Sequence, residues 1–352
     1  MQLSTVAPSS VRVVELDALR GLAALAVVVF HYTTHYQNEV GHTELLGFGF
    51  PAGNYGVQLF FLISGFVIFM TLERTRTTMD FVVSRISRLF PAYWTAMAIT
   101  AVVVYSIGLP AQKLPLSDLL LDLTMVQETF GAEHLDGSYW TLRVELFFYV
   151  QMLFWFMLGQ LRRIRTIIGI WLLLAVAYGL FTKSGSHFSY SMRTVLILRH
   201  IPFFAMGILF YRIHAYPGPH RGDACLIGLC LLAIAIAYAP VYGVVAGVCA
   251  AIFGLFVTGR LNWLRTAPLA YLGAISYSLY LLHQSIGFVL IHQMEQRGIA
   301  PLTAVMLTVG AILVLASALT YLVERPVLRR IRSAWRSRSR LGLGPGTPDP
   351  TG

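Results

Sequence analysis

Runs of apolar residues long enough to cross a lipid bilayer recur along almost the whole chain. A transmembrane helix needs about 17–25 predominantly apolar residues, and only helices and closed barrels satisfy their backbone polar groups inside a bilayer. Of the 352 residues, 57% are hydrophobic and 12% are charged, which is about half the charged fraction of a soluble domain. The sequence therefore predicts an all-α, polytopic integral membrane protein with no sizeable soluble domain.

Ten transmembrane helices account for these runs best. They are expected near residues 17–36, 55–72, 91–110, 139–159, 167–181, 193–211, 224–239, 241–258, 269–292 and 302–323. Asp17 and Arg20 interrupt the first run and no small-residue cleavage site follows it, so we interpret it as a span and not as a cleaved signal peptide. The predicted organisation is an N-terminal segment at 1–16, a transmembrane domain at 17–325, and a basic, partly disordered tail at 326–352.

The distribution of Lys and Arg predicts the side of the membrane on which each loop lies. With both termini in the cytoplasm, 20 of the 26 basic residues fall in cytoplasmic segments, as the positive-inside rule requires. This topology, together with attraction to anionic membrane lipid, accounts for most of the net charge of +10. We expect the arginine-rich stretch at 329–340 to face lipid, and we expect no nucleic-acid partner.

Ionisable groups inside predicted spans are costly, and they usually mark function. The candidates are Asp17, Arg20, His31, Arg143, Glu145, Arg199, His200 and His283. Arg20 and His31 are eleven residues apart, so they share a helix face and stand about 16 Å apart along its axis. Arg20 is expected near the cytoplasmic surface. In contrast, His31, Glu145 and His283 are expected in the outer half of the bilayer, where they can share one layer.

Several of these groups have a purely structural alternative. A lone membrane histidine is often a hydrogen-bonding group between helices, and for His283 this alternative is as good as a functional one. Asp17 and Arg20 have the spacing of a simple ion pair along one helix. Arg143 either extends to the membrane surface or pairs with Glu145.

The segment between the second and third predicted spans carries a pair of arginines. Arg85 and Arg88 are three residues apart, which places them on one face if the segment is helical. Guanidinium groups suit bidentate contacts with phosphate, so the pair is a candidate phosphate clamp. The alternative is that the pair supplies only the positive charge of a cytoplasmic loop.

Six stretches of the chain form an ordered set. They are "LDALRGLAALAVVVFHY" at 16–32, "YGVQLFFLISGFVIF" at 55–69, "RISRLFPAYW" at 85–94, "SYWTLRVELFFYV" at 138–150, "ISYSLYLLHQ" at 275–284 and "VERPVLR" at 323–329. In this order, from about Glu15 to Arg330, they resemble the acyltransferase-3 family of integral membrane acyltransferases, of the O-acetyltransferase type. The family's first span carries a basic residue, ten intervening positions and a histidine, which Arg20 and His31 match. The stretch after Arg330 does not resemble the C-terminal hydrolase-like domain of some members.

The resemblance implies that residues 17–325 form an acyltransferase domain in the cell (inner) membrane. It implies transfer of an acyl group, most often acetyl, from cytoplasmic acyl-CoA to a hydroxyl of an extracytoplasmic carbohydrate or glycolipid, such as a surface polysaccharide or exopolysaccharide. Arg20, Arg85 and Arg88 would bind the donor. His31 would act as general base, since imidazole is the commonest base for such a step. Glu145 would either support the imidazolium of His31 or bind the acceptor.

Four further residues are candidates for supporting this site or binding the acceptor, namely Asp17, Ser64, Tyr280 and His283. Of these, Ser64 is expected to pack between helices rather than to act as a nucleophile. No metal is expected. The cysteines show neither ligand nor disulfide spacing and are predicted to be small buried apolar residues; they are Cys225, Cys230 and Cys249.

Two other functions fit the same residues. In a membrane transporter or flippase for a polysaccharide precursor, the intramembrane charges would line a substrate or proton path. In a structural protein they would only hold helices together. The sequence leaves the oligomeric state open.

Overall fold

The computed structural model describes residues 13–185 and 189–340 of the chain. Within these ranges every regular element is a helix, so the predicted all-α fold class is confirmed. Residues 1–12 of the predicted N-terminal segment and residues 341–352 of the predicted tail lie outside the described residues.

The helices follow one another with short connections. The α-helices are α1 (Val14–Phe30), α2 (Tyr36–Glu39), α3 (Gly56–Glu73), α4 (Thr78–Ile107), α5 (Leu116–Asp122), α6 (Trp140–Met157), α7 (Ile164–Lys183), α8 (Tyr190–Val195), α9 (Ile201–Ala215), α10 (Arg221–Ala237), α11 (Pro240–Val257), α12 (Ala267–Leu282), α13 (Gln284–Glu295), α14 (Pro301–Ala318) and α15 (Arg325–Arg340). Two π-helical segments occur, η1 (His31–His35) and η8 (Leu319–Glu324). The short 3-10 helices are η2 (Pro51–Tyr55), η3 (Pro110–Gln112), η4 (Gln127–Phe130), η5 (Gly137–Tyr139), η6 (Gln160–Arg163) and η7 (Asn262–Leu264).

All ten predicted runs are helical over most of their length. Five described stretches are long and apolar enough to cross a membrane on their own: Pro51–Glu73, Thr78–Ile107, Gln160–Lys183, Pro240–Val257 and Pro301–Ser337. Together, α12 and α13 also meet this requirement, although they are bent by 73°. These helices indicate a multi-pass membrane protein. The count of ten spans and the cytoplasmic location of both termini remain predictions.

Two predicted spans differ from the observed helices. The run at 269–292 is broken at His283, where α12 ends and α13 begins. The run at 193–211 is divided between α8 and α9, and Ile197 between them has a positive φ of 46°. Pro202 lies in the first turn of α9, where proline fits because its missing N–H would have no helical partner.

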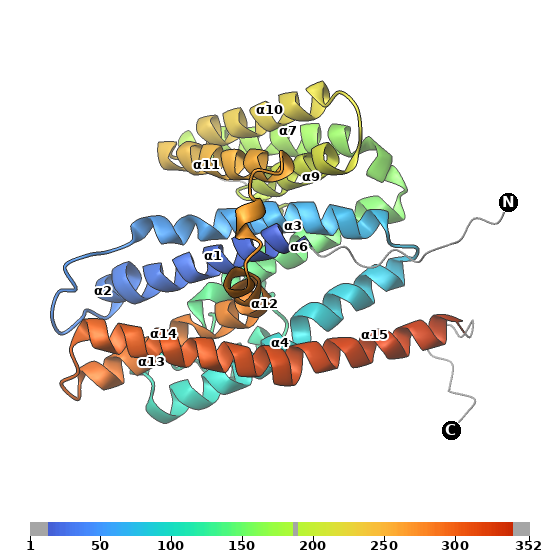
Figure 1. Cartoon of the computed structure of the whole chain (residues 1–352). Coiled ribbons are helices and arrows are strands. Elements are labelled where there is room, and N and C mark those ends of the chain that lie inside the picture. Colours follow the sequence, from blue (N-terminus) through green and yellow to red (C-terminus); the bar gives the residue numbers. More distant parts are fainter. Residues whose placement is uncertain (1–12, 186–188, 341–352) are drawn as a thin grey trace.

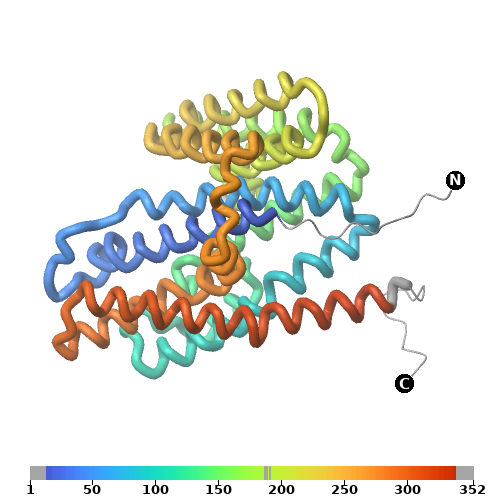
Figure 2. Tube along the Cα trace, viewed as in Figure 1, coloured from blue at the N-terminus to red at the C-terminus, as the bar shows by residue number. Residues whose placement is uncertain are grey.

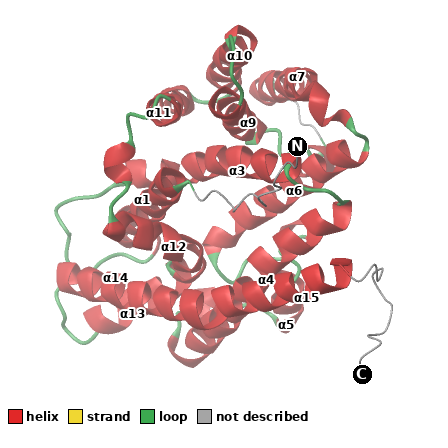
Figure 3. Cartoon of the chain, turned by 45° about the vertical axis from the view of Figure 1, so that its right-hand side comes forward, coloured by secondary structure: helices red, strands yellow, loops and turns green. Residues whose placement is uncertain are grey.

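The helices form three groups. In Figure 1, α7, α9, α10 and α11 lie together on one side of α1 and α3, and α4, α13, α14 and α15 lie on the other side. The turned view in Figure 3 shows the same arrangement, with α12 between α1 and the second outer group. The trace in Figure 2 shows α14, η8 and α15 as one long continuous rod.

Glycines set the closest helix contacts. A Cβ atom on Gly21 of α1 would lie 2.6 Å from the backbone nitrogen of Gly273 in α12. A Cβ atom on Gly65 of α3 would lie 2.1 Å from the carbonyl oxygen of Phe204 in α9. Any larger residue would force these backbones apart, as in other small-residue contacts between membrane helices. The α1–α12 contact therefore fixes the relative position of two helices that carry predicted site residues.

The regular helices are interrupted next to predicted site residues. The π-helix η1 begins at His31, and the 73° bend lies at His283. At this bend the Tyr32 hydroxyl donates to the His283 carbonyl oxygen at 2.7 Å, and the Ser285 N–H donates to Asp136 Oδ2 at 2.8 Å. The His283 carbonyl oxygen also accepts the Gly287 N–H at 3.0 Å, so side chains from distant segments add hydrogen bonds to backbone groups on both sides of the bend. Such interruptions are frequent at functional sites.

Helix α4 begins well before the apolar run that predicted it. Thr77 accepts a hydrogen bond from the Asp80 N–H and donates its own N–H to the Asp80 carboxylate, both at 3.2 Å, which forms a capping box. The segment expected to be a loop is therefore helical from Thr78, and Arg85 and Arg88 lie on consecutive turns of α4.

Candidate active site

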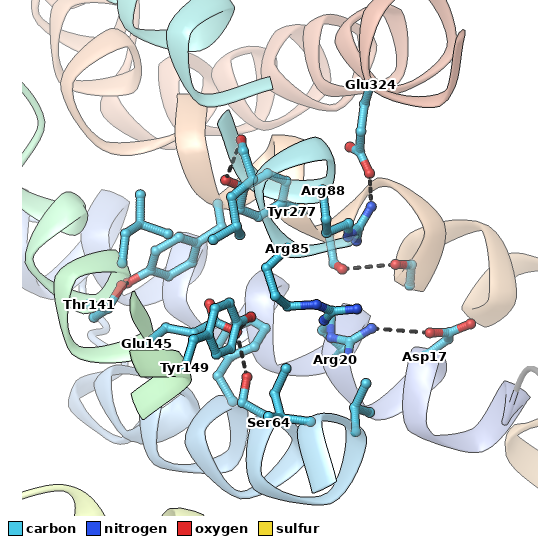
Figure 4. Close-up of a pocket in the computed structure, with 18 of the residues that line it drawn as sticks. Asp17, Arg20, Ser64, Arg85, Arg88, Thr141, Glu145, Tyr149, Tyr277 and Glu324 are labelled. Carbon is cyan, nitrogen blue, oxygen red and sulfur yellow. Dashed lines mark hydrogen bonds and ion pairs between the residues drawn. The ribbon is translucent and has the colours of Figure 1, made fainter. Parts of the chain in front are cut away.

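A cavity of about 480 Å³ lies among α1, α3, α4, α6, α12 and the start of α15. Seven of the nine predicted site residues line it: Asp17, Arg20, Ser64, Arg85, Arg88, Glu145 and Tyr280. Figure 4 shows that arginines occupy one end, whereas Thr141, Ser64 and Glu145 occupy the other. The fold thus gathers residues from more than 260 positions of sequence, Asp17 to Tyr280, around one space.

Arginine side chains define the basic end of the cavity. Arg20 Nη1 donates to Asp17 Oδ1 at 3.2 Å, so the predicted pair along α1 is present. Arg88 forms an ion pair with Glu324 of η8, whose other oxygen accepts the Ser278 hydroxyl at 3.0 Å. These carboxylates hold Arg20 and Arg88 in defined positions (Figure 4).

Glu145 lies in the opposite part of the cavity. Its Oε1 atom accepts the Ser64 hydroxyl at 2.6 Å and also accepts the hydroxyl of Tyr149, which lies one turn along α6. The partners of Glu145 therefore come from α3 and α6, and its carboxylate makes no hydrogen bond to His31 among the described residues.

The two predicted histidines contact each other just beyond the cavity. His31 Nδ1 lies 3.3 Å from His283 Nε2, and the ring centroids are 4.8 Å apart with the planes nearly perpendicular. His31 is 9% exposed and His283 is fully buried. The two histidines are therefore neighbours, whereas Glu145 makes its hydrogen bonds to Ser64 and Tyr149. That all three residues share one layer of the membrane remains a prediction.

Backbone carbonyl groups define the tautomers of this pair. His31 Nδ1 lies 2.8 Å from the Val27 carbonyl oxygen, and His283 Nδ1 lies 2.8 Å from the Tyr280 carbonyl oxygen. A carbonyl oxygen can only accept, so both Nδ1 atoms carry a proton when the rings are neutral. His283 Nε2 then accepts from His31. The Nε2 atom of His31 keeps its lone pair and makes no hydrogen bond within the described part of the chain.

Tyr280 connects the histidines with the cavity. Its ring lines the cavity, and its centroid lies 5.4 Å from the centroid of His283. Its hydroxyl accepts a hydrogen bond from Thr141 at 2.9 Å and donates to the Ser138 carbonyl oxygen at 3.3 Å. The Tyr280 ring therefore lies between the cavity lining and His283.

A buried carboxylate, Asp136, supports the same region. It accepts hydrogen bonds from the N–H and hydroxyl of Ser138, at 2.9 and 2.5 Å, and from the Ser285 N–H at 2.8 Å. Burial raises the pKa of Asp136, while these donors oppose the rise. Asp136 also interacts electrostatically with His31, so it favours positive charge on that ring.

The sequence analysis missed three residues of the candidate site. Asp136 lies three residues before the fourth predicted span, and Glu324 belongs to the quoted "VERPVLR" stretch; a carboxylate beside a membrane span is the signal that would have found both. Arg332 lies in the stretch predicted to face lipid but lines the cavity. Arg143, for which two arrangements were open, forms an ion pair with Glu128 at 2.9 Å.

The described residues contain no group of three or more His, Cys, Asp or Glu side chains that could hold a metal ion. Cys230 and Cys249 are buried, as expected, whereas Cys225 is exposed on the helical surface, which contradicts the prediction for this residue. It lies near the start of α10, and the membrane can cover such a position.

Comparisons with known proteins identify the family of the chain. The family model described as an acyltransferase domain matches residues 13–323. Acyltransferase MdmB of Streptomyces mycarofaciens is 26% identical over 310 residues, which cover 78% of this chain and 79% of that protein. Protein 2 in the picA locus of Rhizobium radiobacter is 34% identical over 117 residues, covering 31% of this chain and 54% of that protein.

A third relative, the exopolysaccharide production protein ExoZ of Rhizobium meliloti (strain 1021), is 28% identical over 141 residues. The match covers 38% of this chain and 44% of that protein. No solved structure matches the chain. The family match covers most of the sequence, and the chain is an acyltransferase that belongs to the acyltransferase-3 family.

Proposed function

We propose that this enzyme transfers an acyl group, specifically acetyl, from cytoplasmic acyl-CoA to a hydroxyl group of an extracytoplasmic carbohydrate. The single observation that carries the proposal is the cavity, which has a basic end and, at its other end, a residue in contact with a histidine pair. An acyl-CoA donor fits this arrangement, because its anionic nucleotide would lie at the basic end and its narrow thioester arm would extend towards the histidines.

Arg20, Arg85 and Arg88 are proposed to receive the phosphates of the donor. They lie on α1 and α4 around one end of the cavity, and charge-assisted contacts with guanidinium groups suit phosphate. The arm would then extend past Ser64 and Glu145 towards Tyr280. This course follows the lining of the cavity from its basic end inward.

His31 is proposed as the general base. Its Nε2 lone pair takes the proton of the acceptor hydroxyl while the hydroxyl oxygen forms a bond to the thioester carbonyl carbon. The carbon–sulfur bond then breaks, and the leaving thiolate takes up the proton from His31. The ester product and free CoA thiol therefore account for every atom and electron pair, and His31 returns to its neutral form.

The carboxylates have separate proposed roles. Asp136, which interacts with His31, stabilises the imidazolium that forms during attack. Glu145 contacts Ser64 and Tyr149 in the cavity wall, which supports a role in positioning the acyl arm or the acceptor over direct support of His31.

A carbohydrate acceptor is supported by the surface beside His31. Thr33, Thr34, Gln37 and Asn38 line a depression of about 520 Å³ that follows directly on His31 in the chain. Hydroxyl and amide side chains of this kind can donate to and accept from sugar hydroxyls. The similarity to the exopolysaccharide production protein ExoZ supports an exopolysaccharide as the acceptor, and the cell (inner) membrane is the proposed location.

The test compares cells that carry the wild-type chain, no chain, or His31→Gln. Mass spectrometry of surface glycans and secreted polysaccharide should show an added acetyl group only with the wild type. Purified protein should transfer label from radiolabelled acetyl-CoA to the same glycan. A transporter or flippase would instead change the amount of exported glycan without changing its mass.

A further inference from the structure

Helix α15 contributes a second basic surface beside the cavity. A groove of about 550 Å³ runs along this helix and is lined by Leu328, Arg329, Arg332, Ser333, Arg336 and Ser337. Arg332 also lines the cavity. The cavity and the groove therefore share two lining residues, Leu328 and Arg332.

Arg332 and Arg85 converge on a single oxygen atom. Arg85 Nη2 donates to the Ser84 hydroxyl oxygen at 3.0 Å, and Arg332 Nη2 donates to the same oxygen at 3.3 Å. The two side chains come from α4 and α15, far apart in the sequence. Two guanidinium groups this close repel each other, so their meeting around one hydroxyl requires an explanation.

No carboxylate among the described residues compensates these two charges. Asp17 pairs with Arg20 and Glu324 pairs with Arg88, but Arg85 and Arg332 are in no described ion pair. The Nε atoms of both are buried and make no hydrogen bond to any described residue. The free structure thus holds unmatched donors and unmatched positive charge.

Neighbouring contacts hold this arrangement in place. Trp335 Nε1 donates to Asp80 Oδ1 at 2.8 Å, which fastens α15 to the first turn of α4. The Arg85 guanidinium carbon lies 5.8 Å from the ring centroids of both Phe81 and Tyr149. The two arginines are therefore preorganised, and this lowers the entropic cost of binding a ligand.

We propose that Ser84, Arg85 and Arg332 form a phosphate-binding subsite that takes the phosphorylated nucleotide end of the acyl-CoA donor. A phosphate group would neutralise both guanidiniums and accept from their free N–H groups. The Ser84 oxygen already accepts twice, so its O–H is free to donate to the same phosphate. The groove along α15 then holds the rest of the nucleotide. This subsite rests on the proposed function, and it makes α15 part of the donor site.

The test measures binding of CoA, without any acceptor, to the full chain in nanodiscs of uncharged lipid. Arg332→Ala should weaken CoA binding by about 10- to 100-fold, the range for losing a charge-assisted contact with phosphate. Arg332→Lys should recover part of the loss, because lysine keeps the charge but not the planar donor pair. Turnover of acetyl-pantetheine, which lacks the nucleotide and its phosphates, should be the same in the wild type and Arg332→Ala.

Arg330→Ala is the matched control. Arg330 is exposed, lies on the same helix, and is turned by about 200° from Arg332 around the helix axis. This variant removes the same charge and should change CoA binding less than twofold. Melting curves of both variants that match the wild type would show that neither change unfolds the protein.

Two results would overturn the subsite, and a third would refute the proposed function. Equal CoA affinity in wild type and Arg332→Ala would overturn the subsite while leaving the proposed function intact. The same would follow if Arg332→Ala weakened only binding to vesicles of anionic phospholipid, because a lipid headgroup would then be the source of the phosphate. A wild-type chain that binds no CoA would instead refute the proposed function itself.

Discussion

The sharpest prediction concerns His31→Gln. Glutamine can donate an N–H where His31 Nδ1 now meets the Val27 carbonyl oxygen and His283, so the structural contacts can be kept. It cannot take up a proton. If His31 is the general base, its loss removes a factor of about 100 to 10,000 from kcat, which corresponds to about 2.7–5.5 kcal/mol of barrier.

His283→Gln provides the comparison within the same pair. In this variant His31 loses one neutral hydrogen bond, at 3.3 Å, but keeps both its ring and its bond to Val27. The net value of such a bond is about 0.5–1.5 kcal/mol, which predicts a decrease in kcat of only about 2- to 13-fold. The ratio between the two variants therefore separates a chemical role from a packing role.

The assay is steady-state transfer of acetyl from acetyl-CoA to purified surface glycan. CoA affinity and melting temperature are measured on the same samples and should match the wild type, because the donor is assigned to Arg20, Arg85 and Arg88 at the basic end of the cavity. Near wild-type turnover in His31→Gln would refute the reasoning. It would make His31 a hydrogen-bonding group between helices and direct attention to Glu145 or His283.

Three further predictions follow from the charges and the topology. Arg88→Ala leaves the Glu324 carboxylate, which is 2% exposed, without its cation. The free energy of unfolding should therefore fall by about 1–3 kcal/mol, measured by thermal unfolding. Adding Glu324→Gln should recover most of this loss, and no recovery would show that the ion pair is unimportant for stability. Burial raises the pKa of Asp122 to about 7, so its contribution to stability is fully present below about pH 4 and is lost as the pH rises to about 7. Asp122→Asn should flatten the pH dependence of the melting temperature over this range, and parallel profiles would contradict the assignment. A reporter fused after Arg329 should be cytoplasmic, and an extracytoplasmic reporter would overturn the topology.

Local pattern was sufficient to predict the parts of the site that depend on one helix. Arg20 and Asp17 are three residues apart on α1 and do form an ion pair. Arg85 and Arg88 have the same spacing on α4, and the structure places both on the cavity. The apolar runs predicted the helices for the same reason, since length and hydrophobicity act within a single segment.

The remaining parts depend on contacts between distant segments. The break at His283 is satisfied by Tyr32 and Asp136, which lie about 250 and 150 residues away in the sequence, so no window around His283 contains its cause. Glu324 forms its ion pair with Arg88, which lies 236 residues earlier in the sequence. Arg332 was predicted to face lipid because its stretch is rich in arginine. Tertiary packing gives the same arginine-rich helix a second surface, facing α4.

The proposed donor-binding residue Arg20 and the proposed base His31 both lie on the helix that begins at Val14, and the packing of this helix sets their separation. Gly21 brings α1 into backbone contact with α12 one residue after Arg20, and η1 begins at His31, where α1 ceases to be regular. A rigid helix between these points fixes the distance from the anion-binding end to the base, since a helix keeps its rise per residue. The π-helical turn then lets the imidazole leave the regular helix face and meet His283. In the proposed mechanism, a donor whose phosphates are held at Arg20 would present its thioester at a fixed depth near His31, and this would explain an arginine and a histidine in one otherwise apolar span.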